Sequence, residues 1–128
     1  MTAVVDTSVL VDHLRGDDRA RRLVREARRS GTRVVASVLT KVEILAGVRP
    51  AETEATRRLL DRLEWIDVDG EVAEQAGALA ARYIRTHPGI EVVDYVIAAS
   101  AQRLDAELWT TNVRHFPMFA GLAPPYGS

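Results

Sequence analysis

Short valine-rich segments alternate with helical segments along this 128-residue chain, and this alternation is the feature that most constrains its fold. Strands are predicted over 3–6, 32–37, 65–69 and 106–112. Strands separated by helices favour a parallel sheet with helices on its faces. We therefore expect an α/β fold, with a mostly parallel sheet of four or five short strands in one domain over residues 1–128. Ligands of such sheets bind outside the carboxyl ends of the strands.

The helices are predicted from the spacing of apolar residues and from capping residues at their ends. They cover residues 7–16, 17–31, 37–48, 51–64, 70–89 and 91–105. Thr7 or Ser8 is expected to cap the first helix and Gly16 to end it. The expected apolar stripe of the helix over 37–48 consists of Val38, Leu39, Val42, Leu45 and Ala46. Residues 113–119 are expected to form a short helical turn or a loop.

Composition excludes several classes of protein. The chain has no cysteine, so disulfides, thiolate zinc sites and cysteine nucleophiles are absent. The chain contains no run of eighteen apolar residues, so no membrane span is expected. The first residues carry Asp6 and Asp12 rather than the basic region of a signal peptide. We therefore expect a cytoplasmic protein without a membrane segment.

Three carboxylates occupy positions that a parallel fold can bring to one edge. Asp6 ends the first strand, Glu43 lies on the helix after the second strand, and Asp94 opens the helix before the fourth. Taken singly, Glu43 is more typical of a solvated residue at the rim of its helix, and Asp94 is also explained as a capping residue. Converging carboxylates repel one another and need cations, and all-oxygen ligands suit Mg²⁺ or Mn²⁺. Such a cluster is typical of phosphodiester hydrolysis.

Other catalytic classes fit the sequence poorly. The three histidines, His13, His87 and His115, lack the spacing of a metal-binding pair, so a zinc site is not expected. The chain has no glycine-rich phosphate loop, and its serines lack the setting of a nucleophile elbow. A phosphohydrolase with an aspartyl nucleophile would need a second acid where Ser8 stands.

Arginines are concentrated near the N-terminus although the net charge is only −1. Residues 15–33 hold eight arginines against three acids. Guanidinium groups match phosphates and carboxylates, so this helix is a potential contact surface for RNA or for a protein partner. The alternative is the codon bias of a GC-rich genome together with a solvated helix face. The residues concerned are Arg21, Arg22, Arg25, Arg28 and Arg29.

Three segments together resemble a known family. "VVDTSVLVDHL", "SVLTKVEILAG" and "VVDYVIAASAQRLDAELWTTNVRHF" are similar to the PIN-domain ribonucleases, and closely to the VapC toxins of bacterial VapBC toxin–antitoxin pairs. The similarity rests on D-T-S, E-I-L-A-G, D-x-x-I-A-A and T-x-N-x-x-H-F in this order. It covers nearly the whole chain and implies a single PIN-like domain.

The resemblance also implies an activity, a cofactor and partners. The family's acids correspond to Asp6, Glu43 and Asp94, and its fourth site position, Asp or Asn, corresponds to Asn112. Its small polar residues correspond to Thr7, with Ser8 beside it, and Thr110. The implied protein is a Mg²⁺- or Mn²⁺-dependent endoribonuclease toxin that cleaves cellular RNA, forms a homodimer and is neutralised by a VapB-type antitoxin covering the active groove. The alternatives are a PIN-like housekeeping nuclease and a non-catalytic module that binds RNA or a partner.

Overall fold

The sheet of the computed structural model has four strands, all parallel, in the order β3-β2-β1-β4. The structure describes residues 1–127, so Ser128, the last residue of the predicted domain, lies outside the described residues. The strands are β1 (Thr2–Val5), β2 (Arg33–Ser37), β3 (Glu64–Ile66) and β4 (Glu107–Trp109). The predicted α/β fold with a parallel sheet is confirmed.

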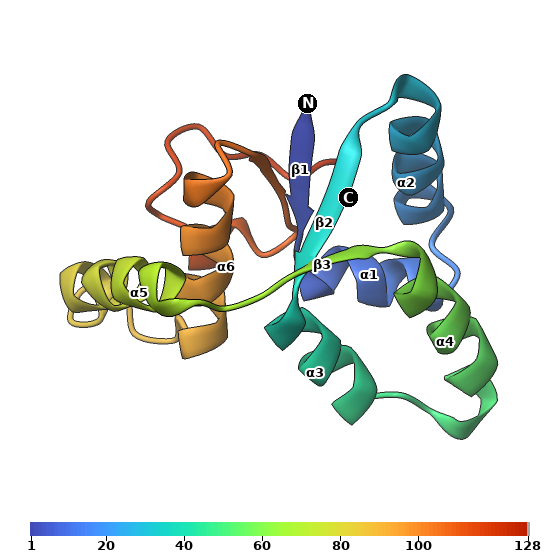
Figure 1. Cartoon of the computed structure of the whole chain (residues 1–128), viewed down its shortest axis with the longest axis horizontal. Coiled ribbons are helices and arrows are strands. Elements are labelled where there is room, and N and C mark those ends of the chain that lie inside the picture. Colours follow the sequence, from blue (N-terminus) through green and yellow to red (C-terminus); the bar gives the residue numbers. More distant parts are fainter. Residues whose placement is uncertain (128) are drawn as a thin grey trace.

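Six α-helices connect and follow the strands, each within a segment predicted to be helical (Figure 1). They are α1 (Thr7–Leu14), α2 (Asp18–Ser30), α3 (Val38–Ala46), α4 (Thr53–Arg62), α5 (Gly70–Tyr83) and α6 (Val92–Arg103). Two single turns of 3₁₀-helix, η1 (Pro50–Glu52) and η2 (Val113–His115), complete the described elements. Among the described residues, no helix combines the length and hydrophobicity needed to cross a membrane.

Helices cover both faces of the sheet, with α5 and α6 on one side and α1, α2 and α4 on the other (Figure 1). Successive side chains along each strand point to opposite faces of the sheet, so the apolar core is divided into one cluster on each face. Val4 and Val35 pack with α5 and α6, while their neighbours Val5 and Ala36 pack with α1 and α4. All four side chains are fully buried. The two apolar clusters therefore hold the sheet between two helical layers.

The ends of several elements differ from the prediction. Asp6, not Thr7 or Ser8, occupies the N-cap position of α1, and its carboxylate makes no capping hydrogen bond, so the predicted cap is wrong. The helix stops at Leu14, and Gly16 lies in the turn beyond it with a φ of 86°. The strand predicted over 65–69 is observed at Glu64–Ile66, and Asp69 instead caps α5 by accepting the Val72 N–H at 2.9 Å.

The predicted apolar stripe of α3 is wrong at Val42, Leu45 and Ala46, which are exposed, whereas Leu39 packs against the core. Val42 and Leu45 are 61% and 42% exposed, whereas Thr40 and Ile44 are buried. The rotation of α3 is set at its start, where the fully buried Ser37 ends β2 and accepts the Leu39 N–H at 3.2 Å. This start turns Thr40 and Ile44 inward and leaves an apolar strip facing solvent.

Candidate active site

The carboxyl edge of the sheet brings together residues that are about a hundred positions apart. The Asp6 N–H donates to the Trp109 carbonyl at 2.9 Å and so continues the pairing of β1 with β4 by one step. Asp6 and Thr110, the first residues beyond these two strands, consequently lie beside each other. The predicted position of Asp6 at a strand end thus has a structural basis in the parallel register.

Asp6 is a buried carboxylate held by hydroxyl groups. It is only 3% exposed. Its Oδ2 accepts hydrogen bonds from the Thr110 hydroxyl at 2.7 Å and from the Ser8 hydroxyl at 3.1 Å. The fully buried Thr110 oxygen in turn accepts the Asn112 N–H at 3.0 Å. Burial of a charge is costly unless hydrogen bonds offset it, and these donors supply that offset on one oxygen of the pair.

Asp94 stands at the start of α6, where it is both a cap and a pocket residue. Its Oδ2 accepts the Glu91 N–H at 3.0 Å and lies 3.1 Å from Nδ1 of His115. Burial is the main cause that raises the pKa of Asp94; the nearby Asp6 carboxylate acts in the same direction, and the Glu91 N–H and His115 oppose it. The predicted capping role of Asp94 is therefore confirmed by its hydrogen bond to the Glu91 N–H. The same carboxylate also lines a pocket with Asp6.

Glu43 reaches the same pocket from α3. Its Oε1 accepts a hydrogen bond from the Thr7 hydroxyl at 2.6 Å, which ties α3 to the first turn of α1. The Thr7 oxygen also lies 3.3 Å from the buried Thr40 hydroxyl. The rotation of α3 that buries Thr40 aims Glu43 at Thr7.

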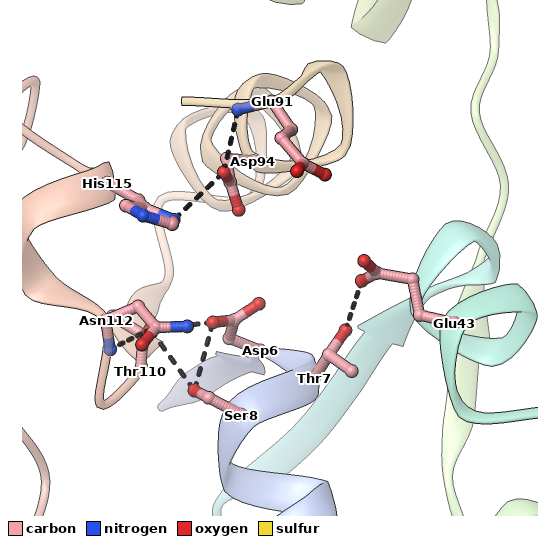
Figure 2. Close-up of polar contacts among 9 residues, drawn as sticks. All are labelled: Asp6, Thr7, Ser8, Glu43, Glu91, Asp94, Thr110, Asn112 and His115. Carbon is pink, nitrogen blue, oxygen red and sulfur yellow. Dashed lines mark hydrogen bonds and ion pairs between the residues drawn. The ribbon is translucent and has the colours of Figure 1, made fainter. Parts of the chain in front are cut away.

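These three carboxylates surround one open space, a pocket of about 410 Å³ (Figure 2). Each hydrogen bond described above uses one oxygen of its carboxylate: Oδ2 of Asp6, Oδ2 of Asp94 and Oε1 of Glu43. Within residues 1–127, the second oxygens have no hydrogen-bond partner. The hydrogen bonds thus fix the carboxylates from behind and leave one oxygen of each for a ligand.

Charge in this pocket is strongly unbalanced. Its lining includes five acids, namely Asp6, Asp12, Glu43, Glu91 and Asp94, and one basic side chain, His115. The donor set consists of hard oxygens, which suits a divalent cation such as Mg²⁺. As they stand, no three acidic or histidine side chains of the described residues lie close enough together to hold an ion. The donor types fit a metal, and side-chain rotation would be needed to place three of them on it.

The remaining predicted site residues divide into two groups. Thr7, Ser8 and Asn112 line the pocket, Asn112 as an exposed residue, and Thr110 lies fully buried beside Asp6. The arginines do not line it. All five are exposed on α2, and two of them border a different pocket. These five are Arg21, Arg22, Arg25, Arg28 and Arg29.

Sequence reasoning missed three ionisable residues that border the acidic pocket. His115 is part of the quoted T-x-N-x-x-H-F motif, so its position carried a signal, although the resemblance assigned this histidine no role in the site. Glu91 lies three residues before Asp94, a spacing that is common at helix starts. Asp12 had no local signal: its carboxylate accepts a hydrogen bond at 2.6 Å from the hydroxyl of Tyr126, near the other end of the chain.

Known proteins share this fold and sequence. The family described as PIN domain matches residues 3–121. Ribonuclease VapC19 of Mycobacterium tuberculosis is 47% identical over 123 residues, which cover 96% of this chain and 98% of that protein. Ribonuclease VapC10 of the same species is 41% identical over 123 residues, covering 96% and 92%. A toxin–antitoxin complex from Klebsiella pneumoniae superimposes with a TM-score of 0.80 at 26% identity, covering 97% of this chain and 98% of that one.

The shared PIN-domain match and these identities over almost the full length define the class. The chain belongs to the PIN domain family and, within it, to the VapC group.

Proposed function

We propose that this chain is a divalent-metal-dependent endoribonuclease of the VapC type, which cleaves cellular RNA and is neutralised by a cognate antitoxin. One observation carries the proposal: Asp6, Glu43 and Asp94 come from three distant elements to one pocket, and each keeps one oxygen free for a ligand. The relatives named ribonuclease share almost the whole chain, which supports the same activity here.

Mg²⁺ is the proposed cofactor, with Mn²⁺ as a substitute, and Asp6, Glu43 and Asp94 are its proposed ligands. When bound, such an ion polarises a phosphoryl oxygen and lowers the pKa of a coordinated water. The protein's own contribution is to hold the ligands in place. Thr110 and Ser8 hold Asp6, Thr7 holds Glu43, and the Glu91 N–H together with His115 holds Asp94.

The acidic pocket sets the conditions under which a polyanion could enter it. Five carboxylates repel a phosphodiester, so RNA approaches productively only when cations offset that charge. A site of this composition is therefore expected to be silent without metal and selective for divalent over monovalent ions.

The partners follow from the proposed activity and from the relatives. We propose that the protein acts on RNA in the cytoplasm. We also propose that residues 1–128 form a single domain. The structure from Klebsiella pneumoniae is titled a toxin–antitoxin complex, which supports a VapB-type partner for this chain. A homodimer stays a prediction, and the exposed Val42 and Leu45 on α3 are apolar side chains that a second copy could cover.

Metal removal tests the proposed function directly. RNA cleavage by the purified protein is expected to disappear in EDTA and to return when excess Mg²⁺ or Mn²⁺ is added, because the proposed ligands are carboxylate oxygens, which suit these ions, and the proposed mechanism depends on the bound ion. The measurement is the rate at which a labelled cellular RNA is cut. Full activity in metal-free buffer would refute the metal site. Cleavage of no RNA under any metal condition would favour a non-catalytic binding module.

Asn112 tests the fourth site position. Asn112→Asp adds a negative charge at the rim of the acidic pocket and should tighten Mn²⁺ binding roughly 5- to 50-fold, an effect of about 1–2 kcal/mol at the effective dielectric of a protein surface. Isothermal titration calorimetry measures the affinity. Glu107→Gln, which changes an exposed side chain at the opposite end of the sheet, is the charge-change control. Unchanged Mn²⁺ affinity in Asn112→Asp would place Asn112 outside the metal site.

A further inference from the structure

A second pocket, at the C-terminal end of α1, is lined mainly by basic side chains. It has a volume of about 190 Å³ and lies between the end of α1 and helices α2 and α4. Arg21 and Arg28 border it from α2, and Arg58 and Arg62 border it from α4. Each pair is spaced by seven or four residues and so occupies one face of its helix. We refer to the space between these four side chains as the arginine pocket.

The positive charge of the arginine pocket is largely uncompensated. Arg58 forms an ion pair with the exposed Glu54 at 3.0 Å, and Arg21 donates from Nε to the His13 carbonyl at 3.2 Å. Within residues 1–127, Arg28 and Arg62 form no ion pair with a carboxylate. A guanidinium group cannot shed its proton at physiological pH, so the four charges persist and repel each other unless an anion enters.

The pKa of His13, which lines the arginine pocket, is affected by the positive charge of these arginines. Burial lowers its pKa, and the charges of Arg21, Arg28 and Arg62 lower it further. Its Nδ1 is buried and has no hydrogen-bond partner among the described residues. In its neutral form the imidazole adds no positive charge to the pocket. The arginines are therefore the groups that an incoming anion would meet.

The size and lining of the arginine pocket limit its occupant. A volume of 190 Å³ corresponds to about six water molecules, which is room for an oxyanion group but less than the usual volume of a small-molecule site. Leu14, Ala55 and Leu59 supply apolar wall and no hydrogen-bond donors. Paired guanidinium forks on two facing helices match the oxygens of a phosphate group.

We propose that the arginine pocket binds a backbone phosphate of the RNA that flanks the phosphodiester in the acidic pocket. This inference rests on the proposed ribonuclease function. The two pockets share α1: Asp12 lines the acidic pocket, and the next residue, His13, lines the arginine pocket. A site lined by five acids holds a polyanion poorly, so affinity for RNA has to come from a positive surface close by.

An acidic segment of a protein partner is the competing occupant. RNA is favoured because four arginines surround a space for a single small oxyanion, and because residues of α1 line both this space and the pocket where RNA would be cut. A protein helix would instead need a long apolar groove with the arginines at its edge. Binding of an acidic peptide is accordingly an outcome to be measured alongside RNA.

Fluorescence anisotropy with a labelled single-stranded RNA of twelve nucleotides, in EDTA over a series of KCl concentrations, tests the proposal. Arg28→Ala with Arg62→Ala should weaken binding roughly 10-fold or more at the lowest salt, since charge-assisted hydrogen bonds are lost. The slope of log affinity against log salt should fall by about 0.7 for the lost phosphate. The pair Arg28→Lys with Arg62→Lys keeps the charge, so its slope should stay at the wild-type value.

The matched control is Arg57→Ala with Arg85→Ala, which removes two exposed arginines outside the arginine pocket. Its net charge equals that of the test variant, and its slope should remain near that of wild type. Equal slopes for the two alanine pairs, or no RNA binding by wild type, would overturn the proposal. An unchanged RNA slope with lost binding of a deca-glutamate peptide would overturn it in favour of a protein partner. Binding is measured in EDTA, which is expected to prevent cleavage, so the binding result does not depend on activity. A protein that binds RNA as expected but never cuts it when Mg²⁺ or Mn²⁺ is present would refute only the proposed function.

Discussion

Asp94→Asn is expected to slow RNA cleavage in Mg²⁺ by at least about 100-fold while leaving the metal-free protein as stable as wild type or more stable. The substitution keeps the size of the side chain and an oxygen that can accept the Glu91 N–H, so the start of α6 is preserved. It removes one charge from a pocket lined by five acids. Asp94→Asn should therefore lower the rate of cleavage while the stability of the metal-free protein stays the same or increases.

The pH dependence gives this prediction a sign. The pKa of Asp94 is raised in the fold, mainly by burial, so the folded protein keeps this proton to a higher pH than the unfolded chain does. The contribution of Asp94 to the stability of the wild-type apo protein should therefore fall as the pH rises from about 4 through the folded pKa, and stay lower above it. Asp94→Asn lacks this loss. The difference in unfolding free energy between variant and wild type should consequently increase towards neutral pH.

Thermal melts with and without Mg²⁺, measured beside a cleavage assay, separate catalytic from purely structural roles of Asp94. Mg²⁺ should raise the Tm of wild type more than that of Asp94→Asn, because only a ligand that prefers the folded state stabilises it. Glu74→Gln, a charge removal on the exposed face of α5, serves as the control and should behave as wild type. An active Asp94→Asn protein with an unchanged Mg²⁺ effect would reduce Asp94 to a helix cap.

Thr110→Val should destabilise the protein by about 2–3 kcal/mol, because Asp6 then loses a charge-assisted hydrogen bond in a buried position. Valine matches the shape of threonine, so the fully buried site is neither emptied nor overfilled. The lost hydroxyl donates to Asp6 Oδ2 at 2.7 Å and accepts the Asn112 N–H at 3.0 Å. Cleavage should fall roughly 10- to 100-fold, since groups that orient a metal ligand commonly have effects of this size.

Thr56→Val is the matched control for Thr110→Val. Thr56 is also buried, but its hydroxyl has no hydrogen-bond partner within the described part of the chain. Replacing that hydroxyl by a methyl group should leave stability unchanged or increase it. Urea denaturation gives the free energy of unfolding for both variants. Equal effects of the two substitutions would show that the Thr110 hydroxyl is not specifically required at Asp6.

Much of the fold could be predicted from the sequence because its signals are local. The helix predicted over 17–31 begins and ends with such local signals: Asp17 accepts the Arg19 N–H at 2.9 Å at the start of α2, and Gly31 takes a φ of 76° after its end. Ile97, Ala98 and Ala101 follow Asp94 at helical spacing, and all three are fully buried. Capping, turn conformation and helical periodicity depend on neighbours within a few residues, which the sequence displays directly.

Other features depended on packing between distant segments, and no local pattern indicates them. The α3 stripe predicted at Val42 and Leu45 faces solvent, because the buried end of β2 sets the rotation of the helix. Thr110 meets Asp6 only through the register of β1 with β4.

The sequence by itself determined the α/β class, the order of its helices and strands, and the acids available for a site. The tertiary structure decided which oxygen of each acid is held and which is left free. It also separated the arginines of α2 into those bordering the arginine pocket, Arg21 and Arg28, and those on open surface. The physical reason is one of range. Periodicity and capping act within a few residues, whereas side-chain direction at a sheet edge and between α2 and α4 is fixed by contacts between segments far apart in the chain.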